Sequence, residues 1–311
     1  MIILVFLVIF KVLFLVFPSA VLQAARDGLV LWFNNIIPAL LPFMVVVNML
    51  TSMGFAQVLG RAFAPVTKKI FGLPGVGGFA LLVGFLSGYP MGAKVVADLH
   101  KAGALSARDA QHMLAFCNNA GPLFILGVVG AGLYGNITVG YALWLGHVAS
   151  ALILGLLFRL VSPPQSSPGF STMHLSPPIT SAGKALGEAV KNAMESMAII
   201  GGLVIFFSAA LAGLGQIGLP SSGSLAGLAA GLVEMTIGAR KVSESAPSVA
   251  TLGVTAFIVA FGGLSVHMQA FHFLEGTGLK STVYLACKVL HGLLAAAITI
   301  FICLFPVFAV K

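Results

Sequence analysis

The chain has 311 residues, of which 59% are hydrophobic and only 8% charged, and its mean hydropathy is +1.07. Apolar runs long enough to cross a bilayer recur along it, which is typical of a polytopic membrane protein and not of a soluble domain. The formal net charge of +8 does not indicate nucleic acid, because the basic residues lie between the apolar runs. The three cysteines lie in apolar segments without C-x-x-C spacing, so neither a disulfide framework nor a zinc site is indicated.

The first apolar run covers residues 2–17 and is closed by Pro18. A signal peptide would carry a basic region ahead of its apolar core, and this run has none. We therefore interpret residues 1–20 as a retained N-terminal membrane helix. The next span is expected at about residues 29–53.

The segment from Gly75 to about Lys101 is interrupted by the string Ser87-Gly88-Tyr89-Pro90-Met91-Gly92-Ala93-Lys94. Only about ten apolar residues precede this turn, which is half a bilayer at about 1.5 Å per residue. Irregular backbone is tolerated at membrane depth only where protein or a water-filled cavity satisfies it. We therefore predict a re-entrant hairpin, two short helices that enter and leave on the same side, with a tip that lines a site.

Spans at about 109–133 and 137–158 are expected next, and the first is broken at Cys117-Asn118-Asn119-Ala120-Gly121-Pro122. A Pro/Ser-rich linker over residues 161–183 then divides the chain into halves. The halves are a first repeat at residues 21–160 and a second at 184–311.

The second half repeats the pattern of the first. Gly28–Gly54 equals Ala189–Gly215 in length, and Met91-Gly92-Ala93-Lys94 corresponds to Ile237-Gly238-Ala239-Arg240. The first break falls opposite residues 260–267, so we expect both halves to carry a hairpin and a broken helix.

Charge placement predicts that the repeats are inverted. If the first helix runs outward, one side collects most of the basic residues: Arg61, Lys68, Lys69, Lys101, Arg108, Arg159, Lys184 and Lys280. That side is then the cytoplasm, and the two hairpins enter from opposite sides. The predicted fold is an all-α polytopic membrane protein with seven full spans and two inverted-topology repeats, each with a re-entrant hairpin and a broken helix. Secondary transporters share this plan, with binding near the midplane.

The Ser87 to Lys94 string, the break from Cys117 to Pro122 and the layout of both halves resemble the YlbJ-type stage V sporulation integral membrane proteins. These proteins belong with the nucleoside-transporter gate domain family and are similar in fold to concentrative nucleoside transporters. The resemblance covers nearly the whole chain, and makes the halves two gate-type repeats. It implies a multi-pass cell-membrane transporter or channel that moves dipicolinic acid across the membrane around the developing endospore.

Two alternatives stay open, because a fold-level resemblance does not establish a substrate. One is a nucleoside or nucleobase transporter, and the other is a structural membrane protein of the spore envelope. Besides the lipid bilayer, the partners that this setting allows are a second copy of the chain or other sporulation membrane proteins. No enzyme is expected, because no Ser-His-Asp or Cys-His constellation and no Walker A string is visible.

Dipicolinate is a small planar dianion, so its site needs facing cationic or N–H-rich groups. Lys94 and Arg240 are predicted to clamp it; the alternative is that they reach the interface or pair with Asp98 and Glu234. Helix N-termini at the hairpin tips add partial positive charge. The remaining predicted substrate-binding residues lie at the tips and breaks: Ser87, Gly88, Tyr89, Asn118, Asn119, Glu234, Thr236, Ser265 and His267, with Gln269 beside them.

Pro122 lacks the N–H that would bond to the carbonyl of Asn118, which leaves that carbonyl free at mid-depth. A coupling cation, a substrate N–H group or water can supply the partner of this carbonyl, and Asn118 and Asn119 are expected beside the substrate. No cofactor or metal site is predicted, and coupling to Na⁺ or H⁺ is left open.

Overall fold

The computed structural model describes residues 2–53, 55–161, 181–218, 223–305 and 308. All regular elements in these ranges are helices. The predicted linker at residues 161–183 lies almost entirely outside the described residues.

The described part of the first half contains eight α-helices and three π-helical segments: α1 (Ile2–Val16), α2 (Pro18–Leu31), η1 (Trp32–Ile36), α3 (Ile37–Ser52), α4 (Phe55–Val66), η2 (Thr67–Phe71), α5 (Gly77–Leu86), α6 (Met91–Lys101), α7 (Ala107–Cys117), η3 (Leu123–Leu133) and α8 (Ile137–Val161). The described part of the second half contains α9 (Ala182–Gly215), α10 (Gly223–Val233), α11 (Met235–Ser243), α12 (Val249–Phe261), α13 (Gly263–Leu274) and α14 (Ser281–Cys303).

The protein is an integral membrane protein, and four helices in the described ranges are long and apolar enough to cross a bilayer. They are α8, α9, the combined run of α12 and α13, and α14. Phe10–Val16 and Pro18–Asn34 make a fifth if this pair, bent by 110°, crosses once. Seven spans were expected from the sequence; segments such as α7 with η3 are divided into pieces too short to span by themselves.

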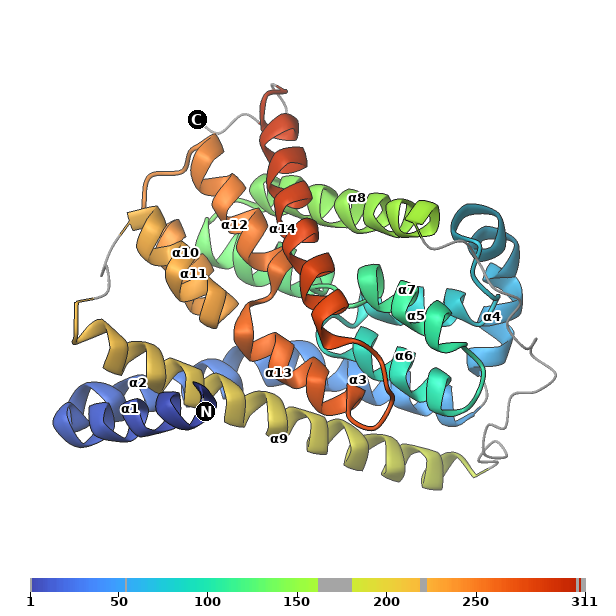
Figure 1. Ribbon diagram of the computed structural model, residues 1–311, viewed down its shortest axis with the longest axis horizontal. Coiled ribbons are helices and arrows are strands. Elements are labelled where there is room, and N and C mark those ends of the chain that lie inside the picture. Colours follow the sequence, from blue (N-terminus) through green and yellow to red (C-terminus); the bar gives the residue numbers. More distant parts are fainter. Residues whose placement is uncertain (1, 54, 162–180, 219–222, 306–307, 309–311) are drawn as a thin grey trace.

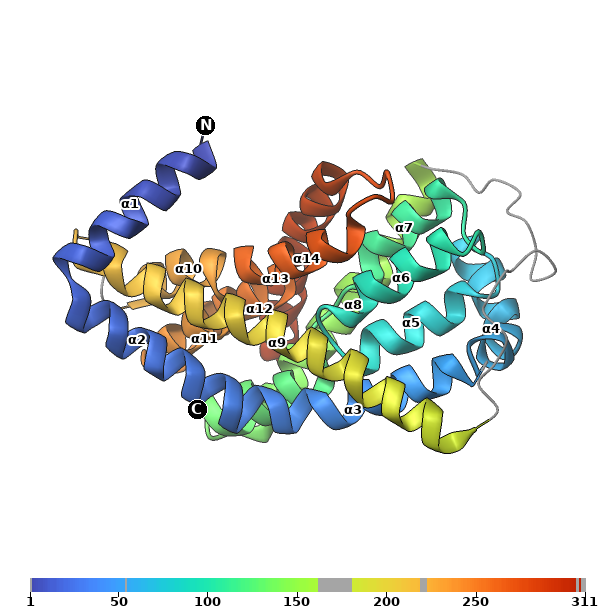
Figure 2. The ribbon, with the colours of Figure 1, turned by 90° about the horizontal axis from the view of Figure 1, so that it is seen from below.

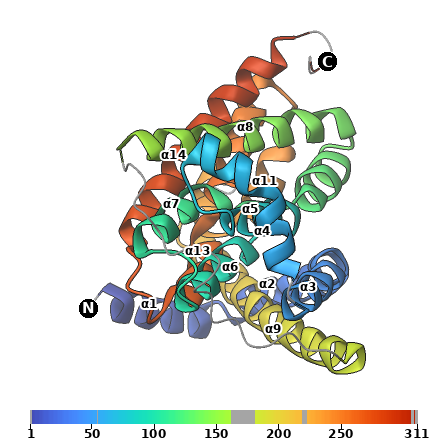
Figure 3. The ribbon, with the colours of Figure 1, turned by 90° about the vertical axis from the view of Figure 1, so that its right-hand side faces the viewer.

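The longest helix, α9, packs against α2 and α3, which run beside it in the opposite direction (Figures 1 and 2). Gly28 of α2 lies against Ser208 near the end of α9, whereas Asn48 of α3 donates a hydrogen bond to the Ala189 carbonyl near its start. Helices α8 and α14 are also antiparallel neighbours, since Gly146 meets Thr299 and Leu154 clusters with Cys287. Figure 3 shows α8 and α14 on one side of α5 to α7, with α9 and α3 on the other.

Both predicted hairpins are pairs of short, mutually packed helices. The first pair is α5 and α6, of 10 and 11 residues, and the second is α10 and α11, of 11 and 9 residues. In Figure 1 the pairs lie on opposite sides of α12 to α14. The inversion of the repeats and the re-entrant course of the pairs in a bilayer stay predictions.

Both predicted helix breaks are present. Helix α7 ends at Cys117 and η3 begins at Leu123. Helices α12 and α13 are separated by Gly262, whose φ of 94° lies in the left-handed region that favours glycine.

Candidate functional site

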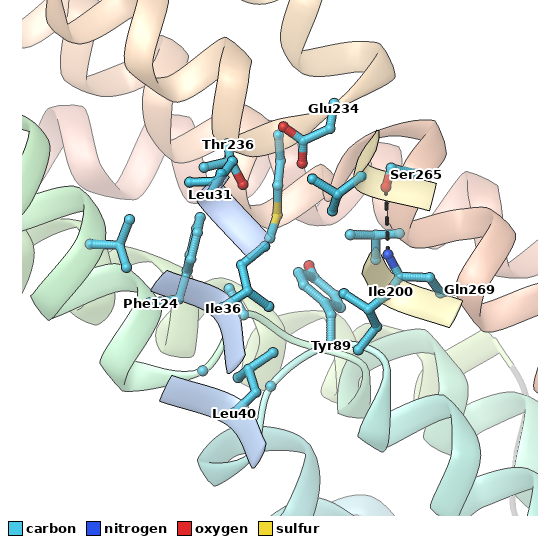
Figure 4. A pocket seen from close by; sticks show the side chains of 17 residues that line it. Leu31, Ile36, Leu40, Tyr89, Phe124, Ile200, Glu234, Thr236, Ser265 and Gln269 are labelled. Carbon is cyan, nitrogen blue, oxygen red and sulfur yellow. Dashed lines mark hydrogen bonds between the residues drawn. The ribbon is translucent and has the colours of Figure 1, made fainter. Parts of the chain in front are cut away.

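A cavity lies where the two short helix pairs meet the two broken helices (Figure 4). It has about 680 Å³ of empty volume, part of which is open to the outside. The tips and breaks contribute Gly88, Tyr89, Ala120, Gly121, Glu234, Met235, Thr236, Ser265, Val266 and Gln269 to its lining. Five further elements, α2, η1, α3, η3 and α9, contribute Leu31, Ile36, Leu40, Phe124, Val128, Ile200 and Val204.

Four helices begin beside the cavity. Tyr89 precedes α6, Gly121 precedes η3, Glu234 caps α11 and Ser265 lies in the first turn of α13. The first turn of a helix leaves N–H groups without intrahelical partners, and its dipole adds partial positive charge. The cavity is therefore surrounded by backbone that favours an anion.

The polar side chains of the cavity come mostly from the second half. Glu234 is 2% exposed, and its carboxylate accepts a hydrogen bond from the backbone N–H of Ile237 at 2.8 Å. Gln269 Nε2 donates to Ser265 Oγ at 3.5 Å, the contact drawn in Figure 4. The N-terminus of α11 is thus partly neutralised by its own cap, whereas the other three helix starts receive no carboxylate cap in the described residues.

Behind Tyr89 lies a buried lysine on α14. Lys288 is 1% exposed, and its ammonium donates to Tyr89 Oη at 2.8 Å, to the Asn118 carbonyl at 3.0 Å and to His291 Nδ1 at 3.0 Å. Tyr89 Oη in turn lies 2.9 Å from the carbonyl of Ala260, to which it donates. One side chain of the cavity wall therefore connects the first tip to the end of α12 and to a buried cation.

Asn118 holds the first break in place. Its side-chain Oδ1 accepts from the Ala93 N–H at 3.2 Å, and its Nδ2 donates to Tyr284 Oη at 2.9 Å. Tyr284 Oη also lies 3.4 Å from His267 Nδ1. Asn118 thereby ties α6, the break and α14 together through its side chain.

Several buried polar atoms around the site have no hydrogen-bond partner among the described residues: Ser87 Oγ, Asn119 Oδ1, His147 Nδ1 and His267 Nε2. Buried polar groups are usually paired, so such a concentration is typical of a place that water or a ligand completes.

The structure brings half of the predicted site residues together at the cavity. Gly88, Tyr89, Glu234, Thr236, Ser265 and Gln269 line the cavity. Ser87, Asn118, Asn119 and His267 are buried but do not line it. Their role in binding stays a prediction.

Lys94 and Arg240, which were predicted to clamp the substrate, do not lie on the wall of this cavity, and their role in binding stays a prediction. Neither lines it: Lys94 Nζ pairs with Asp98 at 2.8 Å, and Arg240 Nε lies 3.9 Å from Glu244. The Arg240 side chain is 73% exposed. Each cation lies beyond the first turn of its helix and meets a carboxylate one turn further on, which keeps it on the outer face.

Lys288 was missed by reasoning from the sequence, although the signal is present. It is the lysine within the long apolar helix Ser281–Cys303, four residues after Tyr284 and three before His291, so the three share a face. An ionisable side chain in a membrane-spanning helix indicates a functional site by default.

The chain is similar in sequence to known membrane proteins. Residues 33–137 match the family model described as "Gate: Nucleoside recognition". The chain is 29% identical over 312 aligned residues to the sporulation integral membrane protein YlbJ of Bacillus subtilis (strain 168), covering 90% of this chain and 76% of that protein. The predicted resemblance to the YlbJ-type sporulation proteins is confirmed. No solved structure shows significant similarity to the chain.

The Gate segment, residues 33–137, contains the first hairpin and the first break, and therefore Tyr89 and Asn118. The matched region does not include Glu234 or Lys288, which lie in the second half. The cavity thus combines the tip of the Gate segment with residues outside it.

Proposed function

We propose that this protein is a secondary-type transporter or channel whose substrate binds in the central cavity. The observation that carries the proposal is the convergence of both short helix pairs and both helix breaks on one cavity. Discontinuous helices that present their ends to a site are the usual way in which transporters bind solutes within the membrane.

The antiparallel packing of matching segments supports inverted repeats. The α2–α3 run and α9 are the equivalent segments expected from the sequence, and α8 and α14 are the equivalent last helices; each pair runs antiparallel. Inverted repeats give two nearly equivalent arrangements around one site, which is the basis of alternating access.

The proposed substrate is dipicolinic acid, moved across the membrane around the developing spore. Helix N-termini at the cavity, in place of Lys94 and Arg240, supply N–H groups for carboxylates, and the Tyr89 ring offers a face for the planar pyridine. Lys288 adds a cation directly behind Tyr89. The sporulation role in the name of YlbJ fits this substrate.

A nucleoside is the second candidate, because a specific observation favours it. Glu234, Ser265 and Gln269 offer a carboxylate and uncharged hydrogen-bonding groups to sugar hydroxyls and base edges. The matched family is described by nucleoside recognition.

A ligand-stabilisation screen of the purified protein tests the proposal. A ligand at 100 times its Kd stabilises the folded state by about 2.7 kcal/mol, which is measurable as a higher Tm. We expect dipicolinate to raise the Tm more than simple dicarboxylates or nucleosides do. A shift given by nucleosides alone would support the second candidate, and no shift with any of them would contradict a solute site of either kind.

Two variants direct the screen at the cavity. Ser265→Ala removes a hydroxyl from the cavity wall, whereas Ser243→Ala removes one at the end of α11, where the hydroxyl bonds to the Arg240 carbonyl. We expect the dipicolinate shift to shrink in the first variant and to persist in the second. Equal shifts in both would place the ligand elsewhere.

A further inference from the structure

The strongest unused feature of the molecule is the environment of Lys288. A lysine ammonium carries three N–H donors and no acceptor. Three acceptors lie within 3.0 Å of Nζ: Tyr89 Oη, the Asn118 carbonyl and His291 Nδ1. The surroundings are therefore complementary to the protonated amine.

One of these acceptors is the carbonyl that Pro122 leaves free. Backbone carbonyls at the C-terminal ends of half-helices are the groups that coordinate coupling cations in transporters with broken helices. Here the ammonium of Lys288 occupies the position beside the Asn118 carbonyl, at the end of α7.

We propose that Lys288 is the proton-binding site that couples transport to a proton gradient, its ammonium taking the place of a sodium ion at the first helix break. The inference rests on the proposed transport function. In each cycle the amine takes a proton from water on one side, Lys–NH₂ becoming Lys–NH₃⁺, and returns it to water on the other.

Tyr89 is the link between this proton and the substrate. When Lys288 is protonated, Tyr89 Oη accepts a hydrogen bond from it and donates its own hydrogen bond to the Ala260 carbonyl, 2.9 Å away. The neutral amine has one donor fewer and a lone pair that attracts the same phenolic proton. The hydroxyl has one proton, so it cannot serve both the amine and Ala260. Loss of the proton therefore loosens the contact between the first tip and the end of α12, beside the cavity.

No carboxylate among the described residues forms an ion pair with Lys288. The titratable groups that face it come from several elements: Tyr89 before α6, His147 of α8, His267 of α13, and Cys287 and His291 of α14 itself. Tyr284, one turn before Lys288 on α14, bonds to the Asn118 side chain. Asn118, directly after α7, contributes its carbonyl, and α12 contributes the carbonyls that Tyr89 contacts. A buried charge without a counterion is costly, so the substrate anion and the proton are expected to bind together.

Uptake of radiolabelled dipicolinate into proteoliposomes tests the inference, with proton and sodium gradients imposed separately. At one proton per dipicolinate dianion the transported unit carries one negative charge, so with the membrane potential held at zero a gradient of one pH unit drives about a tenfold accumulation. We expect the parent protein to accumulate dipicolinate under a proton gradient and to alkalinise the medium as it does so. A sodium gradient should not change the uptake.

Three variants assign the effect. Lys288→Arg keeps a permanent cation, so exchange of internal for external dipicolinate should continue while proton-driven accumulation is lost. Lys288→Met should lose the proton effect as well. Lys280→Gln replaces an exposed lysine at the start of the same helix and should behave like the parent protein.

The outcomes are distinct from those of the proposed function. If uptake by the parent protein responds to a sodium gradient and not to a proton gradient, the inference is overturned, whereas the proposed transport function is retained. A proton effect that persists in Lys288→Arg and Lys288→Met also overturns it. Absence of any uptake or exchange of dipicolinate contradicts the proposed substrate and the inference with it.

Discussion

At the scale of residues, Tyr89 joins features that are far apart in the sequence. Its ring lines the cavity, its hydroxyl bonds to the end of α12, and Lys288 lies 4.9 Å from the ring centroid. Lys288 is 199 positions away along the chain. The contact therefore connects the first tip with the last helix of the second half.

The hydroxyl of Tyr89 should contribute strongly to stability. Tyr89→Phe removes one of the three acceptors of the Lys288 ammonium and the hydroxyl that donates to the Ala260 carbonyl, and a buried group left short of a partner costs about 1–3 kcal/mol. We expect a clear fall in Tm in detergent. Tyr141→Phe removes a hydroxyl from a side chain that is 48% exposed and should change the Tm little. Equal effects would show that the Tyr89 hydroxyl is not part of a buried network.

The cations Lys94 and Arg240 should matter much less to ligand binding. Both make (i, i+4) ion pairs on partly or largely exposed faces, and such pairs contribute about 0–1 kcal/mol. Lys94→Ala and Arg240→Ala should leave the affinity for dipicolinate within a few-fold of the parent value in a titration. A loss of a hundredfold in either variant would restore the dianion clamp that the sequence suggested.

At the scale of elements, the short helix pairs depend on glycine for close packing. A Cβ added at Gly84 or at Gly92 would collide with the backbone of Cys117 at the end of α7. In the second half, one added at Gly238 would collide with the backbone of Gly231. The first pair therefore packs against the helix break, and the second pair packs tightly on itself.

Gly84→Ala should disturb the packing of the first pair. The added Cβ would meet backbone atoms of Cys117, which cannot move away as a flexible side chain could, so α5 and α6 must shift. Overpacking of this kind lowers the stability of the fold by about 1–3 kcal/mol or more. We expect a lower Tm and weaker ligand binding. Gly202→Ala on α9 meets open space and should be neutral or slightly stabilising. Comparable Tm values for the two variants would disprove the close contact.

At the scale of the whole molecule, the proposed inversion has a directional consequence. The loop between α6 and α7 belongs to the first half, and the loop between α11 and α12 is its equivalent in the second. In inverted repeats the two loops lie on opposite sides of the membrane. The charge pattern places the first of them in the cytoplasm.

Cysteine labelling with a membrane-impermeant reagent tests this arrangement. Ala107 and Ala246 are exposed alanines in the two loops or at their ends, and the three native cysteines are buried. Ala107→Cys should react only in inside-out vesicles and Ala246→Cys only in intact cells. Labelling of both from the same side would rule out inversion of the repeats.

The sequence by itself determined the membrane class, the positions of both helix breaks and the two short helix pairs. These are local properties: long apolar runs need a bilayer, while the helices are interrupted at Gly88, at Pro122 and at Gly262 by the backbone conformations that glycine allows and by the N–H that proline lacks. The sequence also indicated which residues lie at the tips, because the position of a turn in the sequence determines which residues form the tip of the helix pair.

Only the tertiary structure decided which cationic side chain lies beside the central cavity. Lys94 and Arg240 come just after the tips, but helical periodicity and a carboxylate one turn away hold them on the outside. Lys288 becomes central because α14 packs against α8 and α12 and so carries it to Tyr89 and Asn118. Contacts across 170 and 199 positions depend on how helices pack, and apolar helices offer many nearly equivalent packings that local patterns do not distinguish.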